Sequence, residues 1–426
     1  MRIRYGLNDH LKKLYIEIWE NTPDSFPVFP DTYRAASQRA KERLAGKLTD
    51  DAIALFRKFP DIDGTEQARW GSALKRLLYS LGTDVLELGE SKMQMLLDGG
   101  FCDATSDFME KARRFDAVIR LDDIFQALRN VWVMNCIQKL TGCRVETTPS
   151  VLAYSMLYPY TDNYLDCTRV PEKNKAWING RLKKRLAGEK ITAGSPLEQK
   201  LFRLVELIEG QYDRDACPMV YESLLGIHSA QEESMRQDMK KPGSRPDVLG
   251  ISIAKGGSSV LADAFLVKGD LSDEEASFFF GFGVILQLLD DMQDAAGDKK
   301  TGHRTVFTAL RPGNSIESLT NKLFNFLTRL LDEDACFTSP AAIEIKELLK
   351  ESIFFLLMRA AALNKRMYET GYLERLECHS GLGFEYFRHL HKKISREYGK
   401  LKLKFAVNPL EVPMAKAFAM GTLSPE

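Results

Sequence analysis

Acidic residues at helical spacing are the part of this sequence best suited to chemistry. Asp162 and Asp166 lie four residues apart, so on a helix their carboxylates project from one face, about one turn from each other. Pro159 lies one turn before this pair and should kink the helix or break it locally. Solvated helix surfaces also carry such pairs, so this segment alone favours neither a metal site nor an ordinary surface.

A second acidic segment follows residues 278–289, a mainly apolar stretch that predicts a buried helix up to the point where the charges begin. Four aspartates lie close to one stripe of that helix: Asp290, Asp291, Asp294 and Asp298. Like charges four residues apart repel each other, and the C-terminal end of a helix disfavours anions. Compensation by a hard divalent cation such as Mg²⁺, shared with a phosphate-bearing substrate, is therefore favoured over a solvated helix end.

Basic residues near both acidic segments could hold phosphate groups. Lys255 lies among small residues in 250–259, and Arg169 follows the first acidic segment by three residues. Lys300 and Arg304 follow the second segment. Each of them alone is typical of a surface charge. Beside two acidic segments they become candidates to hold a diphosphate between metal and cation.

The elements that must position these groups are helices. Apolar residues recur at three- and four-residue spacing through most long segments, and strand-like alternation is scarce, which predicts an all-α fold. Thr148 followed by Pro149 predicts the start of the helix that carries Asp162. Helix ends are predicted at glycine and proline clusters, among them Gly99-Gly100 and Gly297-Asp298.

The same pattern suggests three regions. Residues 1–100 form an extra N-terminal helical layer, residues 101–408 form the helical core, and residues 409–426, with three prolines, form a C-terminal tail.

Composition and charge limit the partners and the compartment. The 426 residues contain 59 Lys+Arg and 59 Asp+Glu, so no bulk field draws the chain to nucleic acid or anionic membrane. The N-terminus lacks an apolar leader, and the longest apolar stretch is shorter than the roughly 20 residues that span a bilayer. The seven scattered cysteines predict neither a disulfide framework nor a zinc site. We therefore expect a cytoplasmic protein without an integral membrane segment.

The two acidic segments resemble the aspartate-rich motifs of class I isoprenoid synthases, the superfamily of trans-prenyl diphosphate synthases and class I terpene cyclases. The resemblance covers roughly residues 115 to 310 and is closest at the second motif, where Gln287 begins the pattern Q-x-x-D-D-x-x-D and G-D follows it. Lys255 is similar to a lysine that binds diphosphate in prenyl diphosphate synthases. Gln231 falls where that family places a glutamine on an intervening helix.

The resemblance implies an all-α class I terpenoid synthase-like bundle around a central apolar cavity. Both motifs would hold a cluster of up to three Mg²⁺ ions, with Mn²⁺ as a substitute, against a prenyl diphosphate substrate, and a homodimer is compatible with it. The implied catalytic residues are Asp162, Asp166, Asp290, Asp291 and Asp294. The implied metal ligands are these five with Asn163 and Asp298, and the implied substrate-binding residues are Lys255, Arg169, Gln231, Gln287, Lys300 and Arg304.

Departures from the family pattern bear on the reaction. Asn163 replaces the second aspartate of the first motif, and Arg169 stands alone where chain-elongating members carry tandem arginines. A G-K-R segment that would bind isopentenyl diphosphate is absent, as is the N-x-x-x-S-x-x-x-E motif of typical terpene cyclases. We therefore expect an atypical terpene cyclase or related lyase, with a trans-prenyltransferase as the alternative.

A second alternative is a non-catalytic helical protein that binds a prenyl chain or a partner subunit. The four residues Asp290, Asp291, Asp294 and Lys255 argue against it, because a scaffold gains nothing from like charges at a buried helix.

Overall fold

A computed structural model describes residues 6–58, 64–165, 167, 169–235, 247–310 and 315–405, and the side chains of these residues except 64–68 and 401–405. All regular structure in these ranges is helical, which confirms the all-α prediction. In chain order the helices are α1 (Leu7–Asn21), α2 (Ala35–Arg57), α3 (Gly64–Ser80), η1 (Leu81–Val85), α4 (Glu90–Asp98), α5 (Phe101–Phe115), α6 (Leu121–Leu140), α7 (Pro149–Leu165), α8 (Glu172–Leu186), α9 (Pro196–Gln211), α10 (Pro218–Ser234), α11 (Val248–Lys268), α12 (Asp273–Thr301), α13 (Ile316–Asp332), α14 (Pro340–Leu363), η2 (Lys365–Met367), α15 (Thr370–Glu377) and α16 (Phe384–Phe405).

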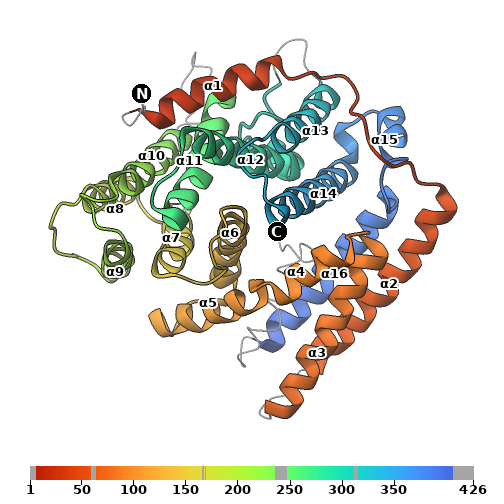
Figure 1. Cartoon of the computed structure of the whole chain (residues 1–426), viewed down its shortest axis with the longest axis horizontal. Coiled ribbons are helices and arrows are strands. Elements are labelled where there is room, and N and C mark those ends of the chain that lie inside the picture. The colour runs from red at the N-terminus through yellow and green to blue at the C-terminus, as the bar shows by residue number, and fades with distance from the viewer. Residues whose placement is uncertain are drawn as a thin grey trace.

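Helix α11 lies inside the bundle and is its central element (Figure 1). It packs against α12, α10, α1, α6 and α7. Within the described residues it is the one helix long and apolar enough to cross a membrane, and 89% of its most apolar window is buried inside the protein. Such burial is typical of a core helix that is apolar all round.

A close backbone contact joins α11 to α12. A Cβ atom built on Gly283 would lie 2.1 Å from the carbonyl oxygen of Gly256. One built on Gly257 would lie 2.3 Å from the ring of Phe280. Because packed cores do not yield by such distances, larger residues here would push the helices apart. These glycines therefore fix how α12 lies on α11.

The predicted buried helix over residues 278–289 is confirmed as part of α12, in which these residues are buried except for a half-buried pair at 286 and 287. The predicted helix end at Gly297-Asp298 is wrong, because α12 continues to Thr301. It ends at Gly302, whose φ of 81° is the left-handed conformation that terminates helices. Gly297 is exposed, and a helix tolerates glycine there at a cost of about 1 kcal/mol relative to alanine.

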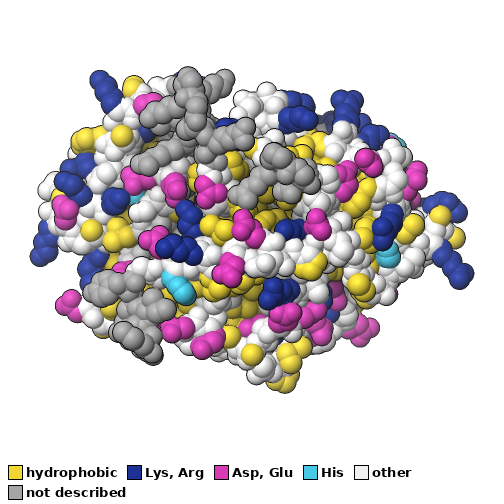
Figure 2. Space-filling model, turned by 90° about the horizontal axis from the view of Figure 1, so that it is seen from above, with side chains coloured by type: hydrophobic (Ala, Val, Ile, Leu, Met, Phe, Trp, Pro, Cys, Tyr) yellow, Lys and Arg dark blue, Asp and Glu magenta, His cyan; other side chains and the backbone are white. Residues whose placement is uncertain are grey.

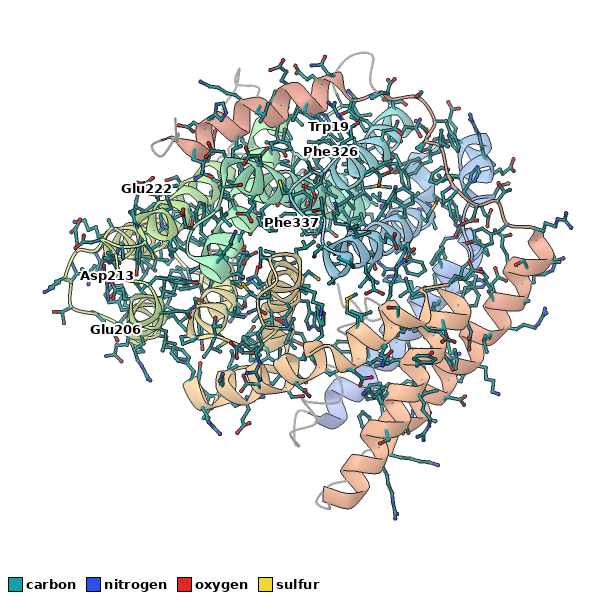
Figure 3. All side chains as sticks on the ribbon, in the orientation of Figure 1. Trp19, Glu206, Asp213, Glu222, Phe326 and Phe337 are labelled. Atoms are coloured by element: carbon teal, nitrogen blue, oxygen red, sulfur yellow. The ribbon has the colours of Figure 1, made fainter. Side chains whose placement is uncertain are left out.

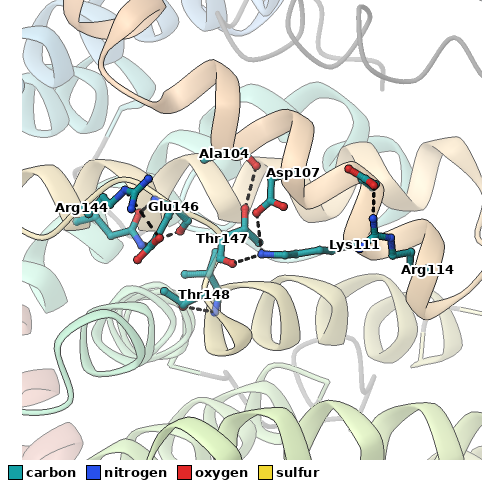
Figure 4. A network of polar contacts seen from close by, with 11 residues as sticks. Ala104, Asp107, Lys111, Arg114, Arg144, Glu146, Thr147 and Thr148 are labelled. Carbon is teal, nitrogen blue, oxygen red and sulfur yellow. Dashed lines mark hydrogen bonds and ion pairs between the residues drawn. The ribbon is translucent and has the colours of Figure 1, made fainter.

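Two sets of contacts fix the start of α7. The Oγ1 atom of Thr148 accepts a hydrogen bond from the backbone N–H three residues on, at 3.3 Å, and Pro149 takes the first helical position, as predicted. Just before it, Thr147 donates to the carbonyl of Ala104, and Lys111 donates to the carbonyl of Thr147 at 2.7 Å (Figure 4). Helix α5 thus anchors the loop that leads into α7.

The first hundred residues contact the rest of the protein at several places. Helix α1 lies across α11 and α12, and Trp19 meets Phe326 of α13 edge to face with ring centroids 5.7 Å apart (Figure 3). Helix α2 packs against α3, η1 and α16, and α4 packs against α5 and α14. Helix α4 ends at Asp98 and α5 begins at Phe101, so a helix end lies at Gly99-Gly100 as predicted. The tail at 409–426 lies outside the described residues.

Charges are mixed over the face shown in Figure 2. Acidic and basic side chains alternate there with apolar ones, and neither sign forms a continuous patch. This distribution agrees with the equal numbers of acidic and basic residues in the sequence.

Candidate active site

Helices α7 and α11 run antiparallel. The hydroxyl of Ser150, near the start of α7, donates to the carbonyl of Leu266, near the end of α11, at 2.8 Å. Eight residues further along α7, Tyr158 hydrogen-bonds the hydroxyl of Ser259. The acidic end of α7 therefore points toward the N-terminal end of α11.

Helices α12 and α11 also run antiparallel. Gly283 lies against Gly256, and further along α12 the carboxylate of Asp291 accepts a hydrogen bond from Ser252 at 2.8 Å. The acidic end of α12 therefore points toward the same N-terminal end of α11 as the acidic end of α7.

The register of these contacts sets the levels of the two motifs. Asp162 lies four residues beyond Tyr158, whereas Asp291 is level with Ser252, seven residues before Ser259. At about 1.5 Å of rise per residue, Asp162 and Asp291 lie at levels that differ by roughly 5 Å along α11. The fold thus brings the two acidic segments, which are far apart in the sequence, to one end of the bundle.

Lys255 lies between the two contacts. Ser252, Lys255 and Ser259 are spaced three and four residues apart, so they share one stripe of α11. The first serine contacts α12 and the second contacts α7. Lys255 is half-buried, and its charge is close enough to Asp291 to act on the pKa of that carboxyl.

Asp291 is the most enclosed acid of the second motif. It is 6% exposed, and its other carboxylate oxygen accepts a hydrogen bond from Gln287 at 2.9 Å. Burial, with a smaller effect from the charge of Asp290, raises the pKa of Asp291 to about 6. The hydrogen bonds from Gln287 and Ser252, and the charge of Lys255, act in the opposite direction. They favour the ionised form that a cation would bind.

The first motif is held by neighbours from two other helices. Asp162 is half-buried and accepts a hydrogen bond from Gln231 of α10 at 2.6 Å. Asn163 is exposed and donates to Asp123, at the start of α6, at 2.9 Å. This hydrogen bond places a carboxylate of α6 next to the first motif. Asp166 lies outside the described residues.

The remaining predicted residues lie further out. Asp290 and Asp294 are exposed on the last turns of α12, and Asp298 is half-buried with its carbonyl capped by the backbone N–H groups of Gly302 and His303. Lys300 is exposed at the end of the same helix.

Two predicted arginines complete the set. Arg304 is half-buried just after α12, and Arg169 is exposed in the turn after α7.

We name the acidic end as the described aspartates that gather at the N-terminal end of α11: Asp122, Asp123, Asp162, Asp290, Asp291 and Asp294. In the described part of the chain, no three acidic, histidine or cysteine side chains already converge on a common metal position. The donors present are carboxylate, amide and hydroxyl oxygens, which are the ligands that Mg²⁺ prefers, and Mg²⁺ needs only one or two carboxylates when phosphate and water complete its shell.

Sequence reasoning missed three supporting residues. Ser252 holds Asp291, and Asp123 lies beside Asn163. Asn364 follows α14 and donates to the carbonyls of Met292 and Gln293 at 2.9 and 3.1 Å, which ties this part of α12 to the end of α14. Ser252 lies one turn before Lys255, so its position on the same helix face could have been predicted from the sequence. Nothing in the sequence near Asp123 or Asn364 indicates their contacts.

A second buried carboxyl lies deeper in the bundle. Asp263 of α11 is fully buried, and one of its oxygens accepts a hydrogen bond from Asn130 of α6 at 2.9 Å. Asn130 also donates to Ser155 of α7 at 3.2 Å. The other oxygen of Asp263 has no hydrogen-bond partner. Burial raises the pKa of this carboxyl well above its usual value. We refer to Asn130, Ser155 and Asp263 as the inner cluster.

Comparisons with known proteins add no family: no family model matches the chain, and no curated protein or solved structure matches it either.

Proposed function

We propose that this protein is a Mg²⁺-dependent class I terpene synthase, which ionises a linear prenyl diphosphate and then cyclises or quenches the carbocation. The observation that carries the proposal is the register of α7 and α12 on α11, which brings both acidic segments to one end of the bundle on either side of Lys255. Acidic segments gathered at one end of a bundle repel each other, and a metal-bound diphosphate between them would supply the compensating cations.

In this proposal the residues of the chain divide the work of binding. Asp162, Asp290 and Asp291 would hold Mg²⁺, which supplies Lewis-acid stabilisation of the negative charge that develops on the leaving diphosphate. Lys255 would donate to a phosphate oxygen from the stripe between the two acidic segments. Gln231 would orient the carboxylate of Asp162, as it does in the structure at 2.6 Å.

Gln287 and Ser252 would perform the same task for Asp291. Both carboxylate oxygens of Asp291 are already engaged by these donors, so the side chain is oriented before any ligand binds. A ligand that needs no reorientation of its acceptor loses less free energy on binding. Cytoplasmic location, without an integral membrane segment, completes the proposal.

The test separates the proposed reaction from the alternatives. The purified chain is incubated with C10 to C25 prenyl diphosphates and Mg²⁺, with and without isopentenyl diphosphate, and extracts are examined by mass spectrometry. A hydrocarbon or alcohol from a single substrate supports the synthase. Longer diphosphates formed only with isopentenyl diphosphate would assign a trans-prenyltransferase instead.

A binding experiment tests the site itself. Pyrophosphate with Mg²⁺ should raise the melting temperature of the wild-type chain, since a ligand that binds only the folded state stabilises it. Asp290→Ala should abolish this rise. A variant of an exposed acid far from the acidic end, Glu110→Ala on α5, is the control and should keep it. An unchanged rise in Asp290→Ala would place the diphosphate elsewhere.

A further inference from the structure

A small cavity lies between α7, α8 and α10, next to the acidic end. Its volume is about 50 Å³. The lining includes Gln231 and Thr161 near Asp162, and extends to Tyr154, eight residues before Asp162 on α7. Since a cavity needs roughly 10 to 15 Å³ on this scale to hold one water molecule, this one has room for a few waters.

The lining of this cavity combines an apolar wall with a few polar atoms. The wall consists of leucine and isoleucine side chains from the three helices: Leu157, Leu165, Leu182, Leu186, Leu224 and Ile227. The polar lining comes from Tyr158, Thr161, Asn179, His228 and Gln231. A cavity with such a lining can hold an ordered water, because a bound water needs about two to four polar partners.

His228 lines the cavity, and its Nδ1 atom has no hydrogen-bond partner. Its Nε2 atom lies 3.1 Å from the carbonyl oxygen of Asn179, and since a carbonyl can only accept, Nε2 carries the hydrogen. In the neutral ring Nδ1 then has a free lone pair, and this atom is buried without a partner. Burial also lowers the pKa of His228, which keeps the ring neutral.

Glu232 lies where it can stabilise a proton on that nitrogen. Its Oε2 atom is 3.9 Å from Nδ1 of His228, too far for a hydrogen bond to neutral imidazole but close enough for charge attraction to imidazolium. The carboxylate is held by Asn179 and Lys183, each at 3.1 Å.

We propose that this cavity holds the water that ends the reaction and that His228 is the catalytic base that activates it. The water oxygen forms a C–O bond to the carbocation, one O–H bond breaks, and the proton moves to Nδ1 of His228. The product is an alcohol, and Glu232 balances the charge of the imidazolium. This inference rests on the proposed function, since the carbocation arises only when diphosphate leaves.

The test uses His228→Gln, because the glutamine amide keeps a donor for the carbonyl of Asn179 but has no basic nitrogen. The full-length chain is incubated with a C15 prenyl diphosphate and Mg²⁺ in water enriched in ¹⁸O, and both diphosphate release and products are measured. The matched control is His389→Gln, a histidine whose side chain is 69% exposed. The wild-type chain and the control should make mainly an alcohol that contains ¹⁸O.

In His228→Gln the alcohol should fall on the order of 100-fold relative to hydrocarbon, the usual size of a general-base contribution, while diphosphate release changes less than about threefold. An unchanged ratio of alcohol to hydrocarbon, or a wild-type product that is only hydrocarbon, would overturn the role of His228 and leave the synthase proposal standing. Absence of diphosphate release from the wild-type chain would overturn both.

A second variant covers the case in which His228→Gln does not fold. Glu232→Gln keeps an acceptor for Asn179 and leaves His228 in place but removes the charge that stabilises the imidazolium. It should lower the share of alcohol about tenfold with diphosphate release retained. An alcohol share equal to that of the wild-type chain would contradict the proposed proton transfer.

Discussion

Asp291 and Asp263 are both buried carboxyls on the central helix pair, but their surroundings differ. Asp291 lies at the acidic end, and each of its oxygens accepts a hydrogen bond, from Ser252 and from Gln287. Asp263 lies in the inner cluster, where one oxygen accepts from Asn130 and the other has no partner. Burial raises the pKa of both. Only the first is surrounded by donors that favour the charged form.

This difference separates a site that can bind cations from a site that holds a proton. Donors and Lys255 around Asp291 lower the cost of ionisation, so the carboxylate is mostly ionised at neutral pH and can bind a metal. At Asp263 the free energy needed to bury an unpaired charge is much larger than the stabilisation from one hydrogen bond. The neutral acid is therefore favoured. Four experiments test this contrast.

Paired asparagine substitutions give the largest expected effect. Asp291→Asn should lower Mg²⁺-dependent diphosphate release on the order of 1000-fold, about 4 kcal/mol, because an amide cannot supply the charge of a metal ligand. Asp263→Asn should change it less than about threefold, since the amide mimics a neutral acid. Steady-state rates at saturating Mg²⁺ measure both. Equal losses would erase the distinction between the two sites.

A substitution that pushes α11 and α12 apart should have the next largest effect, on the free energy of unfolding. Gly283→Ala places a methyl group against the backbone of Gly256, so it should lower the free energy of unfolding by about 3 kcal/mol. Gly210→Ala on α9 is the control, because nothing lies within 4 Å of its Cβ position, and it should be neutral or stabilising by up to about 1 kcal/mol. Urea unfolding followed by circular dichroism measures both. A tolerated Gly283→Ala would show that the close contact is not required.

The pH dependence of stability distinguishes the two carboxyls without any ligand. A raised pKa means that the folded protein keeps a proton that the unfolded chain releases above about pH 4, so the free energy of unfolding falls as pH rises, by at most about 1.4 kcal/mol per pH unit. The fall due to Asp291 should stop near its folded pKa of about 6, whereas that due to Asp263 should continue above it.

These contributions are measured as the stability difference between each asparagine variant and the wild-type chain from pH 4 to 8, without metal. Relative to the wild-type chain, Asp291→Asn should gain stability only up to about pH 6, and Asp263→Asn should go on gaining. Curves that level off together would show that the two carboxyls share one environment.

Removal of one donor should give the smallest effect. Ser252→Ala takes away one of the two hydrogen bonds to Asp291 and should weaken Mg²⁺-pyrophosphate binding about tenfold. Ser258→Ala is the control on the same helix, since its hydroxyl donates to Asn8 rather than to an acid. Isothermal titration calorimetry measures both affinities. Equal affinity in the two variants would mean that Ser252 does not orient the carboxylate.

Several features of the fold followed from sequence alone because they depend on neighbours within four residues. Thr148 and Pro149 begin α7 as predicted, and the apolar stretch over 278–289 forms a buried helix. Gly297 shows the limit of local rules, because a single exposed glycine does not end a helix that Gly302 can cap one turn later.

The aspartate stripes and Lys255 were visible in the sequence as candidates, but their partners were decided by tertiary structure. Gln231 reaches Asp162, and Ser252 reaches Asp291, only because helices far apart in the sequence lie in one register on α11. That register depends on side-chain volumes and on the contact of Gly256 with Gly283, which no local pattern specifies. Helical periodicity is set by residues one turn apart, whereas the environment of a charge depends on which distant surfaces fit together.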